Sequence, residues 1–552
     1  MENYLSSAIS KIYGEDDDFI LLGLTGRTGS GCSTVAKILA SKRENIKHSL
    51  FKGDTPSCNN ERKEKIIIQH FDKNWQPFIL IQVRSIITLM LVEEDIKQVE
   101  KYLLQPEFSI DPKSIKNIVD IIKDIKEEYA DSSKEKCARD FYSDTLPSKC
   151  ELIKQYLGES SFVKLYQRIG KNIRNSGNPL KQEQIKGLFF TLAERINSVI
   201  TELREQKSGE EKTFIVVDAI RSPLEAIYFQ ERYSSFYLIA ISCEDKQRKQ
   251  RLRNLGYTDP AIKTIDEQEY VDTDIEDESS YVTQDIQACL QRSDLYVSNQ
   301  DSENEVSEFK VLTNQLLKFV SLMKRPGLVT PTALERCMQI AYTAKLNSGC
   351  ISRQVGAVIT DENFSVQAIG WNDAPYGQVP CNLRSRFDLI EGRDQVAYSE
   401  YEKTETAFIE FIEKRNVQFI PIIETGRNVS YCFKSEYNSM TKKSNQVHTR
   451  SLHAEENAFL QISKYGGRGI KGGNLFTTAS PCELCAKKAY QLGIKNIFYI
   501  DPYPGIAMKH ILMGGAHNPK MVLFFGAIGR AFHRLYTPIV AYKDELNALS
   551  NT

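Results

Sequence analysis

Short apolar runs alternate with helical patterns over residues 1–323 of the chain. The runs show no regular apolar–polar alternation, which is typical of strands buried on both faces of a sheet. A helical pattern from Ser33 to about Ala40 follows the first run. This succession predicts an α/β fold with a parallel sheet covered by helices. The predicted strands are Phe19–Leu24, Thr213–Val217, Phe236–Ser242 and Leu295–Ser298.

Residues 61–207 interrupt this alternation of strands and helices. They are rich in Lys, Glu, Ile and Leu at helical spacing, so we interpret them as a helical insertion into an N-terminal domain of residues 1–323. A further helical pattern runs from Glu303 to Met323. The acidic cluster Asp272–Ser280 is expected to form a solvated loop.

Residues 324–331 are predicted to link two domains, because two prolines and a glycine break regular structure there. Residues 332–552 then predict an α/β/α domain, a sheet with helices packed on it. Residues 375–447 lack a simple period and are interpreted as an insertion. The expected elements are a helix over 332–346, a hairpin from 355–360 and 365–371, helices beginning near His453 and Cys482, and strands at 474–478, 496–500 and 521–525.

The composition of the chain argues against some classes of protein. With 41% apolar and 26% charged residues the chain can build sizeable cores, and its formal net charge of -1 provides no global basic field for nucleic acid. Of the 12 cysteines only Cys482 and Cys485 stand at metal-ligand spacing. The N-terminus lacks a signal-like pattern, and the longest apolar run, 78–92, contains polar residues. We therefore expect a cytoplasmic protein that is not embedded in a membrane.

The strongest chemical pattern is a set of zinc ligands beside a glutamate. Catalytic zinc takes three protein ligands and leaves a fourth position open, and His453, Cys482 and Cys485 supply one imidazole and two thiolates. A Cys-x-x-Cys pair at a helix start places both sulfurs on one side of the first turn, where unpaired N–H groups stabilise thiolate charge. Glu455 is placed to move a proton between water and a leaving amine.

A structural zinc knuckle or unrelated cysteines would be the simplest reading of a Cys-x-x-Cys pair alone. The combination of His-x-Glu at 453–455 with Pro-Cys-x-x-Cys at 481–485 is instead the signature of zinc nucleobase deaminases. The sequence therefore predicts a zinc-dependent hydrolytic deaminase in the C-terminal third of the chain.

Four blocks of sequence resemble the deoxycytidylate deaminases. They are Ser348–Ile359, Gly370–Pro375, His453–Ala458 and Ser480–Cys485, and they occur in the same order as in that family. The resemblance implies that Asn372 contacts the sugar or base of a nucleotide. It also suggests substrate contacts by Arg353, Gln354, Asn457 and Tyr503, although Arg353 and Gln354 equally fit ordinary solvated strand-edge residues.

The insertion at 375–447 departs from the compact members of that family. Some members carry a second, structural zinc nearby, and Cys381, Cys432 and His448 lie in or beside the insertion. No close pair of ligands is found there, so buried thiols and a surface histidine are the favoured interpretation.

A glycine-rich loop follows the first predicted strand and opens a helix, which is the context of a P-loop. Backbone N–H groups would hold the phosphates of a nucleoside triphosphate, and Ser33 would hold Mg²⁺. Cys32 stands where the P-loop lysine is expected, which weakens the case for phosphoryl transfer more than for nucleotide binding. The candidate residues are Gly26, Arg27, Thr28, Gly29, Ser30, Gly31, Cys32, Ser33 and Thr34.

Residues further along support a nucleotide-binding interpretation. Asp218 ends an apolar strand and suits metal positioning, and Arg221 follows it. Arginines at 248, 251 and 253 come after the next strand in an order that resembles nucleoside monophosphate kinases. A tight turn and a salt-bridged helix are the alternative explanations.

A P-loop, kinase-like domain ahead of a deoxycytidylate deaminase domain resembles the bacterial anti-phage dCTP/dCMP deaminases. The resemblance implies deamination of free dCTP or dCMP to dUTP or dUMP, depletion of that pool during infection, a homo-oligomer and, in some members, inhibition by a small RNA. Two rivals remain at this stage, a deaminase of polynucleotide cytosine or adenine and a non-catalytic nucleotide sensor.

Overall fold

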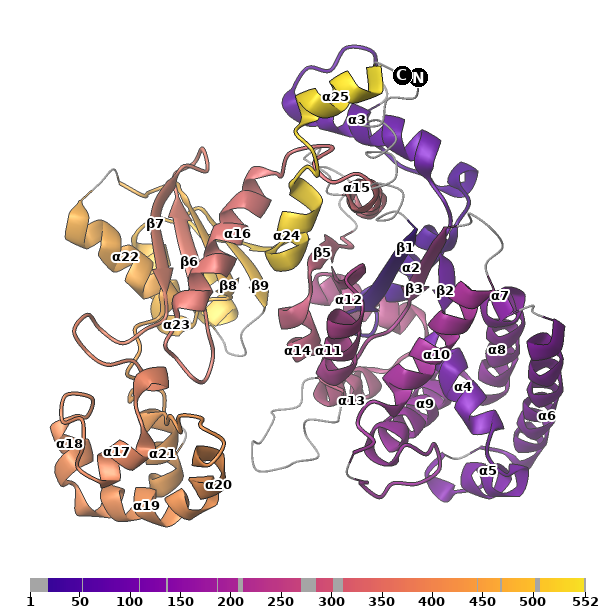
Figure 1. The fold of residues 1–552 in the computed structure, drawn as a ribbon, viewed down its shortest axis with the longest axis horizontal. Helices are drawn as coiled ribbons and strands as arrows, with labels where there is room; N and C mark the ends of the chain where they lie inside the picture. Colours follow the sequence, from indigo (N-terminus) through magenta and orange to yellow (C-terminus); the bar gives the residue numbers. More distant parts are fainter. Residues whose placement is uncertain are drawn as a thin grey trace. The chain divides into compact units, whose positions relative to one another are not determined.

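The computed structural model describes residues 18–550 except 52, 109, 136–137, 186, 207–211, 270–283, 301–310, 444, 467–468 and 502–506 (Figure 1). The chain divides into two compact units. The first unit holds Met1–Pro331 together with Phe525–Thr552, and the second holds Thr332–Phe524. The C-terminal domain was expected to span 332–552, but the second unit ends at Phe524, and the residues after it group with the first unit.

The first unit is built on a six-stranded sheet in the order β11-β5-β4-β1-β3-β2. All neighbours are parallel except β11, which pairs antiparallel with β5. The predicted strands are confirmed, and β2 and β11 are additional. The strands are β1 Phe19–Thr25, β2 Ile79–Ile81, β3 Thr213–Val217, β4 Phe236–Ser242, β5 Leu295–Ser298 and β11 Gly526–Ala527.

Successive residues of each central strand enter two different cores. In β3, Ile215 and Val217 belong to one hydrophobic cluster, whereas Phe214 and Val216 belong to the other. Strand side chains alternate between the two faces of a sheet, so both faces of this sheet are covered. This explains the continuous apolar runs in the sequence.

Helices between residues 83 and 205 cover one of these faces, and the other helices complete the first unit (Figure 1). The expected insertion is mostly helical, but it begins too early, because β2 belongs to the sheet. The helices of the first unit are α2 Cys32–Ala40, α3 Asn59–Asn74, α4 Val83–Val92, α5 Ile96–Leu103, α6 Pro112–Glu135, α7 Ala138–Asp140, α8 Leu146–Leu157, α9 Glu159–Ser176, α10 Thr191–Glu205, α11 Pro223–Arg232, α12 Asp245–Asn254, α13 Asp259–Glu269, α14 Ile286–Arg292, α15 Leu312–Lys324, α24 Gly529–Tyr536 and α25 Tyr542–Ser550.

The C-terminal residues join the first unit through packing as well as pairing. Ala531 and Leu535 of α24 lie in the same core as α2, α3 and α15. Arg530 also donates to the carbonyl of Phe236 at 3.0 Å. The acidic cluster expected at 272–280 and the residues before 311 of the expected 303–323 helix lie outside the described residues.

The second unit is built on a five-stranded mixed sheet in the order β10-β9-β8-β6-β7. Strand β6 is antiparallel to β7 and β8, whereas β8, β9 and β10 run parallel to one another. The expected hairpin and the later strands and helices are confirmed. The elements are α16 Ala333–Ala344, β6 Gly356–Thr360, β7 Val366–Trp371, α22 Ala454–Tyr465, β8 Asn474–Ala479, α23 Glu483–Gln491, β9 Asn496–Asp501 and β10 Lys520–Leu523.

Two glycines let helices approach opposite faces of this sheet. A Cβ on Gly370 would lie 2.3 Å from the carbonyl oxygen of Ala454 in α22, and one on Gly356 would lie 2.0 Å from that of Ala341 in α16. Gly370 pairs with Ala357 across β6 and β7, so Gly356 faces the other side. The sheet is therefore sandwiched between α16 and α22, the expected α/β/α arrangement.

The segment without a simple period, 375–447, folds into short helices with a small core of their own. Within it the side chains of Arg384 and Glu402, both 0% exposed, form an ion pair, and the Tyr431 hydroxyl donates to Glu402 at 2.6 Å. Such short helices give weak periodic signals. They are α17 Arg386–Ile390, α18 Glu400–Thr404, α19 Thr406–Asn416, α20 Ile420–Ile423 and α21 Phe433–Thr441.

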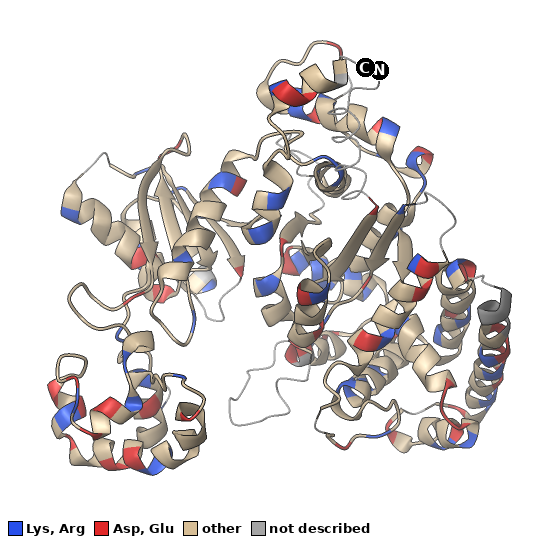
Figure 2. Ribbon diagram, viewed as in Figure 1, with Lys and Arg blue, Asp and Glu red and all other residues tan. Residues whose placement is uncertain are grey.

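Charges of both signs are interspersed along the helices of each unit (Figure 2). Within the described part of the chain, no helix is both long and apolar enough to cross a bilayer.

Candidate metal centre

Two helix starts bring the three predicted zinc ligands together. His453 is the N-cap residue of α22, Cys482 is the N-cap residue of α23, and Cys485 lies in the first turn of α23. Both helices follow segments fixed by the sheet: Leu452 bridges to Asp373, and β8 leads directly into the Cys482 turn. The sheet thereby positions both helix N-termini at one site.

The ligand atoms are close enough to share one metal ion. The Sγ atoms of Cys482 and Cys485 lie 3.2 Å and 3.5 Å from Nδ1 of His453. Within the residues that the structure describes, these three form the one group of three or more His, Cys, Asp or Glu side chains with all ligand atoms within 4.8 Å of one another. One nitrogen and two sulfurs form a donor set that suits tetrahedral zinc with a fourth position left for water.

Electrostatics of the ligand set favour a thiolate. A hydrogen bond from the Cys485 thiol, followed by one with His453, lowers the pKa of Cys482 to about 3. The same hydrogen bond raises the pKa of Cys485. The hydrogen bond to Cys482 raises the pKa of His453. Zinc binds the deprotonated thiol, so metal binding at these two sulfurs would release protons.

Glu455 lies beside the ligands but is not one of them. It is the second residue of α22, 4% exposed, and its Oε1 accepts a hydrogen bond from Thr477 Oγ1 at 3.2 Å. Burial raises the pKa of this carboxyl group. A buried carboxyl group with a raised pKa, next to a metal site, is suited to accept and return a proton.

Two of the expected substrate contacts are engaged with neighbouring residues. Arg353 forms an ion pair with Asp501, which is fully buried at the end of β9. Gln354 donates from Nε2 to the carbonyl of Ser348 at 3.2 Å. Asp501 thus anchors the loop before β6 to the end of β9.

Asn372 and Asn457 brace the backbone around the site. The Asn372 amide donates to the carbonyl of Arg353 at 2.7 Å and accepts from the N–H of Val355 at 2.6 Å. Asn457 donates to the carbonyl of Trp371 at 2.9 Å, which ties α22 to the end of β7. Their contact with a substrate stays a prediction.

The sequence also singled out Tyr503, Cys381 and His448 in this unit. Tyr503 lies outside the described residues. Cys381 is buried, and burial followed by the nearby Cys432 raises its pKa. His448 packs against Tyr437, with ring centroids 4.6 Å apart and the ring planes tilted by 56°.

The glycine loop of the first unit holds an internal carboxylate. Oε1 and Oε2 of Glu269 accept from the Thr28 N–H at 3.0 and 3.1 Å, and Oε1 also accepts from the Thr28 hydroxyl. Arg221 donates to the same Oε1 at 2.8 Å. Glu269 is fully buried there at the end of α13, so a charged carboxylate sits where the loop meets the start of α2.

Other arginines around the loop are also neutralised by acidic side chains. Arg27 pairs with Asp245 at 3.0 Å and with Asp266 at 2.6 Å. Arg248, 1% exposed, pairs with the same two aspartates and donates to the carbonyl of Thr28 at 3.1 Å. Three arginines thus surround the loop, and Asp245, Asp266 and Glu269 balance their charge.

Cys32, Ser33 and Asp218 take different positions around the loop. Burial raises the pKa of the Cys32 thiol to about 11, so this residue does not supply charge. Ser33 is exposed at the start of α2. Asp218 accepts from the N–H of Val83 at 2.9 Å, and burial raises its pKa.

Sequence reasoning did not identify Thr477, Asp501 or Glu269. Asp501 carried a signal, a carboxylate at the end of an apolar strand, like Asp218. Thr477 and Glu269 carried none, because an ordinary strand threonine and a glutamate in a charged helix are common.

Residues 331–501 match the family model described as the cytidine and deoxycytidylate deaminase zinc-binding region. The deoxycytidylate deaminase of Enterobacteria phage T2 is 31% identical over 166 residues, which are 30% of this chain and 78% of the phage protein. That of phage T4 is 31% identical over 168 residues, 30% of this chain and 76% of the phage protein. The crystal structure of dCMP deaminase from cyanophage S-TIM5 in complex with dCMP and dUMP aligns with 36% of this chain and 99% of its own, at 21% identity and a TM-score of 0.22.

Proposed function

The chain belongs, through residues 331–501, to the cytidine and deoxycytidylate deaminase family, and from this membership we propose that it deaminates a free deoxycytidine nucleotide, dCTP or dCMP, hydrolytically. The observation that carries the proposal is the group of His453, Cys482 and Cys485 with Glu455 buried beside it. The near-neutral net charge of -1 favours a free nucleotide over a polynucleotide.

The chemistry follows from the residues at the site. A zinc ion bound by the three ligands would lower the pKa of water from about 15.7 to about 7, so that a nucleophile exists at neutral pH. The carboxylate of Glu455 takes a proton from the attacking water as its oxygen bonds to C4 of the cytosine ring, and passes that proton to N3 as the C4–N3 double bond opens. Glu455 then takes the remaining hydroxyl proton and delivers it to the amino nitrogen, so that ammonia leaves and the C4 carbonyl forms. Thr477 holds Oε1 of Glu455 in place during both transfers.

Replacement of Glu455 tests this role. Glu455→Gln keeps the size of the side chain but removes the proton carrier, so we expect turnover of dCTP and dCMP to fall at least about 100-fold while bound zinc is retained. Ammonia release and elemental analysis measure the two quantities.

Glu456→Gln is the matched control, because Glu456 is the next residue of α22 and pairs with Lys488. Its activity should stay within about threefold of the unmodified chain, since a half-exposed ion pair contributes little. Retained turnover in Glu455→Gln would contradict the mechanism. Turnover of single-stranded DNA in preference to free nucleotides would contradict the substrate class.

A second function is favoured for the first unit. We propose that its glycine loop is a P-loop-like, kinase-related phosphate site for a nucleotide with Mg²⁺. The support is the Glu269 carboxylate, an anionic group that already accepts hydrogen bonds from the Thr28 N–H and from Arg221. Backbone N–H groups and cations that hold a carboxylate also suit a phosphate. With a neutral thiol at Cys32 in place of lysine, binding is favoured over phosphoryl transfer.

A further inference from the structure

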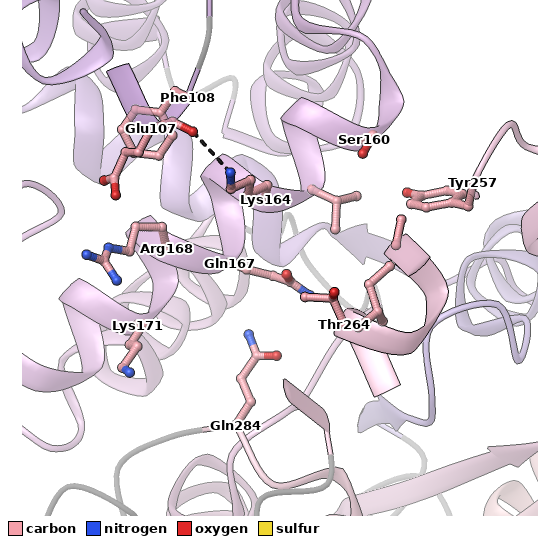
Figure 3. A pocket seen from close by; sticks show the side chains of 13 residues that line it. Glu107, Phe108, Ser160, Lys164, Gln167, Arg168, Lys171, Tyr257, Thr264 and Gln284 are labelled. Atoms are coloured by element: carbon pink, nitrogen blue, oxygen red, sulfur yellow. Dashed lines mark hydrogen bonds between the residues drawn. The ribbon is translucent and has the colours of Figure 1, made fainter. Parts of the chain in front are cut away.

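A cavity of about 500 Å³ lies in the first unit between α9, α13 and the single helical turn Pro106–Phe108 (Figure 3). None of its lining residues belongs to the glycine loop. Ligand sites in proteins commonly have volumes of about 300–1,000 Å³. The cavity is therefore large enough for a small-molecule ligand.

One wall of the cavity is positively charged. Lys164, Arg168 and Lys171 are spaced four and three residues apart on α9, so they share one face of that helix. Figure 3 shows all three beside the cavity, with the Lys164 amine hydrogen-bonded to the main-chain oxygen of Glu107 at 3.0 Å. Among the described residues that line the cavity, Glu107 supplies the one carboxylate.

These cations differ from the other arginine of the same helix. Arg174 is buried and paired with Glu225 at 2.7 Å. Among the described residues no ion pair neutralises Lys164, Arg168 or Lys171, and the Nε atom of Arg168 is buried without a hydrogen-bond partner. A concave site with uncompensated cations attracts an anion, and arginine suits phosphate oxygens.

The rest of the cavity suits a flat, polar ring. Gln167 and Gln284 each offer one amide donor pair and one acceptor, and both point toward the middle of the cavity in Figure 3. Tyr257 and Phe108 add aromatic surface, and Val163 and Ile265 add aliphatic surface. Apolar walls with a few placed polar groups are typical of sites that bind small molecules.

We propose that this cavity binds a nucleoside phosphate, with its phosphates on Arg168 and Lys171 and its base between the two glutamines. The proposal does not depend on deamination in the second unit. It also places the ligand against α13, because Thr264 and Ile265 line the cavity while Asp266 and Glu269 of the same helix hold the glycine loop.

Binding measurements on the full chain test the site. Calorimetry with ATP and with dTTP, neither of which carries a cytosine, should give binding that Arg168→Gln with Lys171→Gln weakens at least about tenfold, because charge-assisted hydrogen bonds to phosphate are lost. Gln167→Leu with Gln284→Leu should weaken nucleotide binding by a similar factor and leave inorganic pyrophosphate binding unchanged.

Lys116→Gln with Lys126→Gln is the matched control, since both lysines are exposed on α6 and lie outside the cavity. This pair should leave the affinity unchanged, and thermal unfolding should show that every variant is folded. Photo-crosslinking with 8-azido-ATP should label peptides that contain 160–171 or 257–265. Equal affinities in the cavity variants and the control, labelling elsewhere, or binding of pyrophosphate as tight as that of nucleotides would overturn the proposal.

Discussion

Single side chains set the chemistry of both units. In the second unit, one carboxyl group, Glu455, is held by Thr477 beside three metal-ligating atoms. In the first unit, another carboxylate, Glu269, fills the glycine loop by binding Thr28 and Arg221. The two glutamates have opposite roles in the proposals made above, because the first would carry a proton in deamination and the second would compete with any phosphate that enters its site.

Removal of the charge on Glu269 should therefore make the glycine loop more accessible to nucleotide. Glu269→Gln keeps the shape of the side chain but abolishes its charged hydrogen bonds, so we expect ATP with Mg²⁺ to bind at least about tenfold more tightly. Calorimetry on the full chain measures this affinity. Arg168→Gln and Lys171→Gln are introduced as well, so that binding in the basic cavity does not contribute.

Glu267→Gln is the control for this experiment, because Glu267 lies on the same helix, is 65% exposed and pairs only loosely with Lys263 at 3.7 Å. An unchanged affinity in Glu269→Gln would show that the loop is a tight turn held by a structural carboxylate.

At the scale of elements, helix N-termini and close helix–sheet contacts hold these side chains in position. Helix α22 brings both His453 and Glu455 to the site, and its backbone rests directly on Gly370 of β7. The apolar–polar pattern predicted the hairpin, the strands and both helix starts correctly. It did not predict β2, which has three residues, or the short helices of 375–447, since such elements contain too few residues to show a period.

Enlarging Gly370 should displace α22 and disturb the metal centre. In Gly370→Ala the added Cβ would meet main-chain atoms of Ala454 and Ala458 at 2.3 and 2.5 Å, so the helix must shift. We expect a loss of about 1–3 kcal/mol in the free energy of unfolding, together with weaker zinc retention and lower deaminase activity. Denaturant unfolding and elemental analysis measure the first two.

Gly469→Ala is the matched variant, because a Cβ at Gly469 would meet no atom within 4 Å. It should unfold within about 0.5 kcal/mol of the unmodified chain. Equal stability of the two variants would mean that α22 does not rest on Gly370.

At the scale of the whole molecule, one chain combines a deaminase domain with a second α/β unit, which has a glycine loop holding the Glu269 carboxylate and a cavity lined by basic side chains. If the proposed activity is correct, cells that express the chain should lose dCTP and dCMP and gain deoxyuridine nucleotides, measured by mass spectrometry of nucleotide pools. Cells expressing Glu455→Gln should keep normal pools, and Glu456→Gln should behave like the unmodified chain. The predicted defence against phage is measured by the efficiency with which phage forms plaques. This efficiency should fall only in cells whose deoxycytidine nucleotide pools fall.

The sequence by itself determined the features that depend on neighbouring residues or on a fixed spacing. These include the parallel-sheet strands, the helix starts at 453 and 482, and the ligand set of His453, Cys482 and Cys485 with Glu455 beside it, since each follows from local pattern and chemistry. The tertiary structure decided what joins distant parts of the chain. It brought residues 525–552 back to the first unit, Thr477 to Glu455 and Glu269 to Thr28, and it formed the basic cavity beside α13. Contacts of this kind depend on how elements pack, and no local pattern encodes which side chains will then face one another.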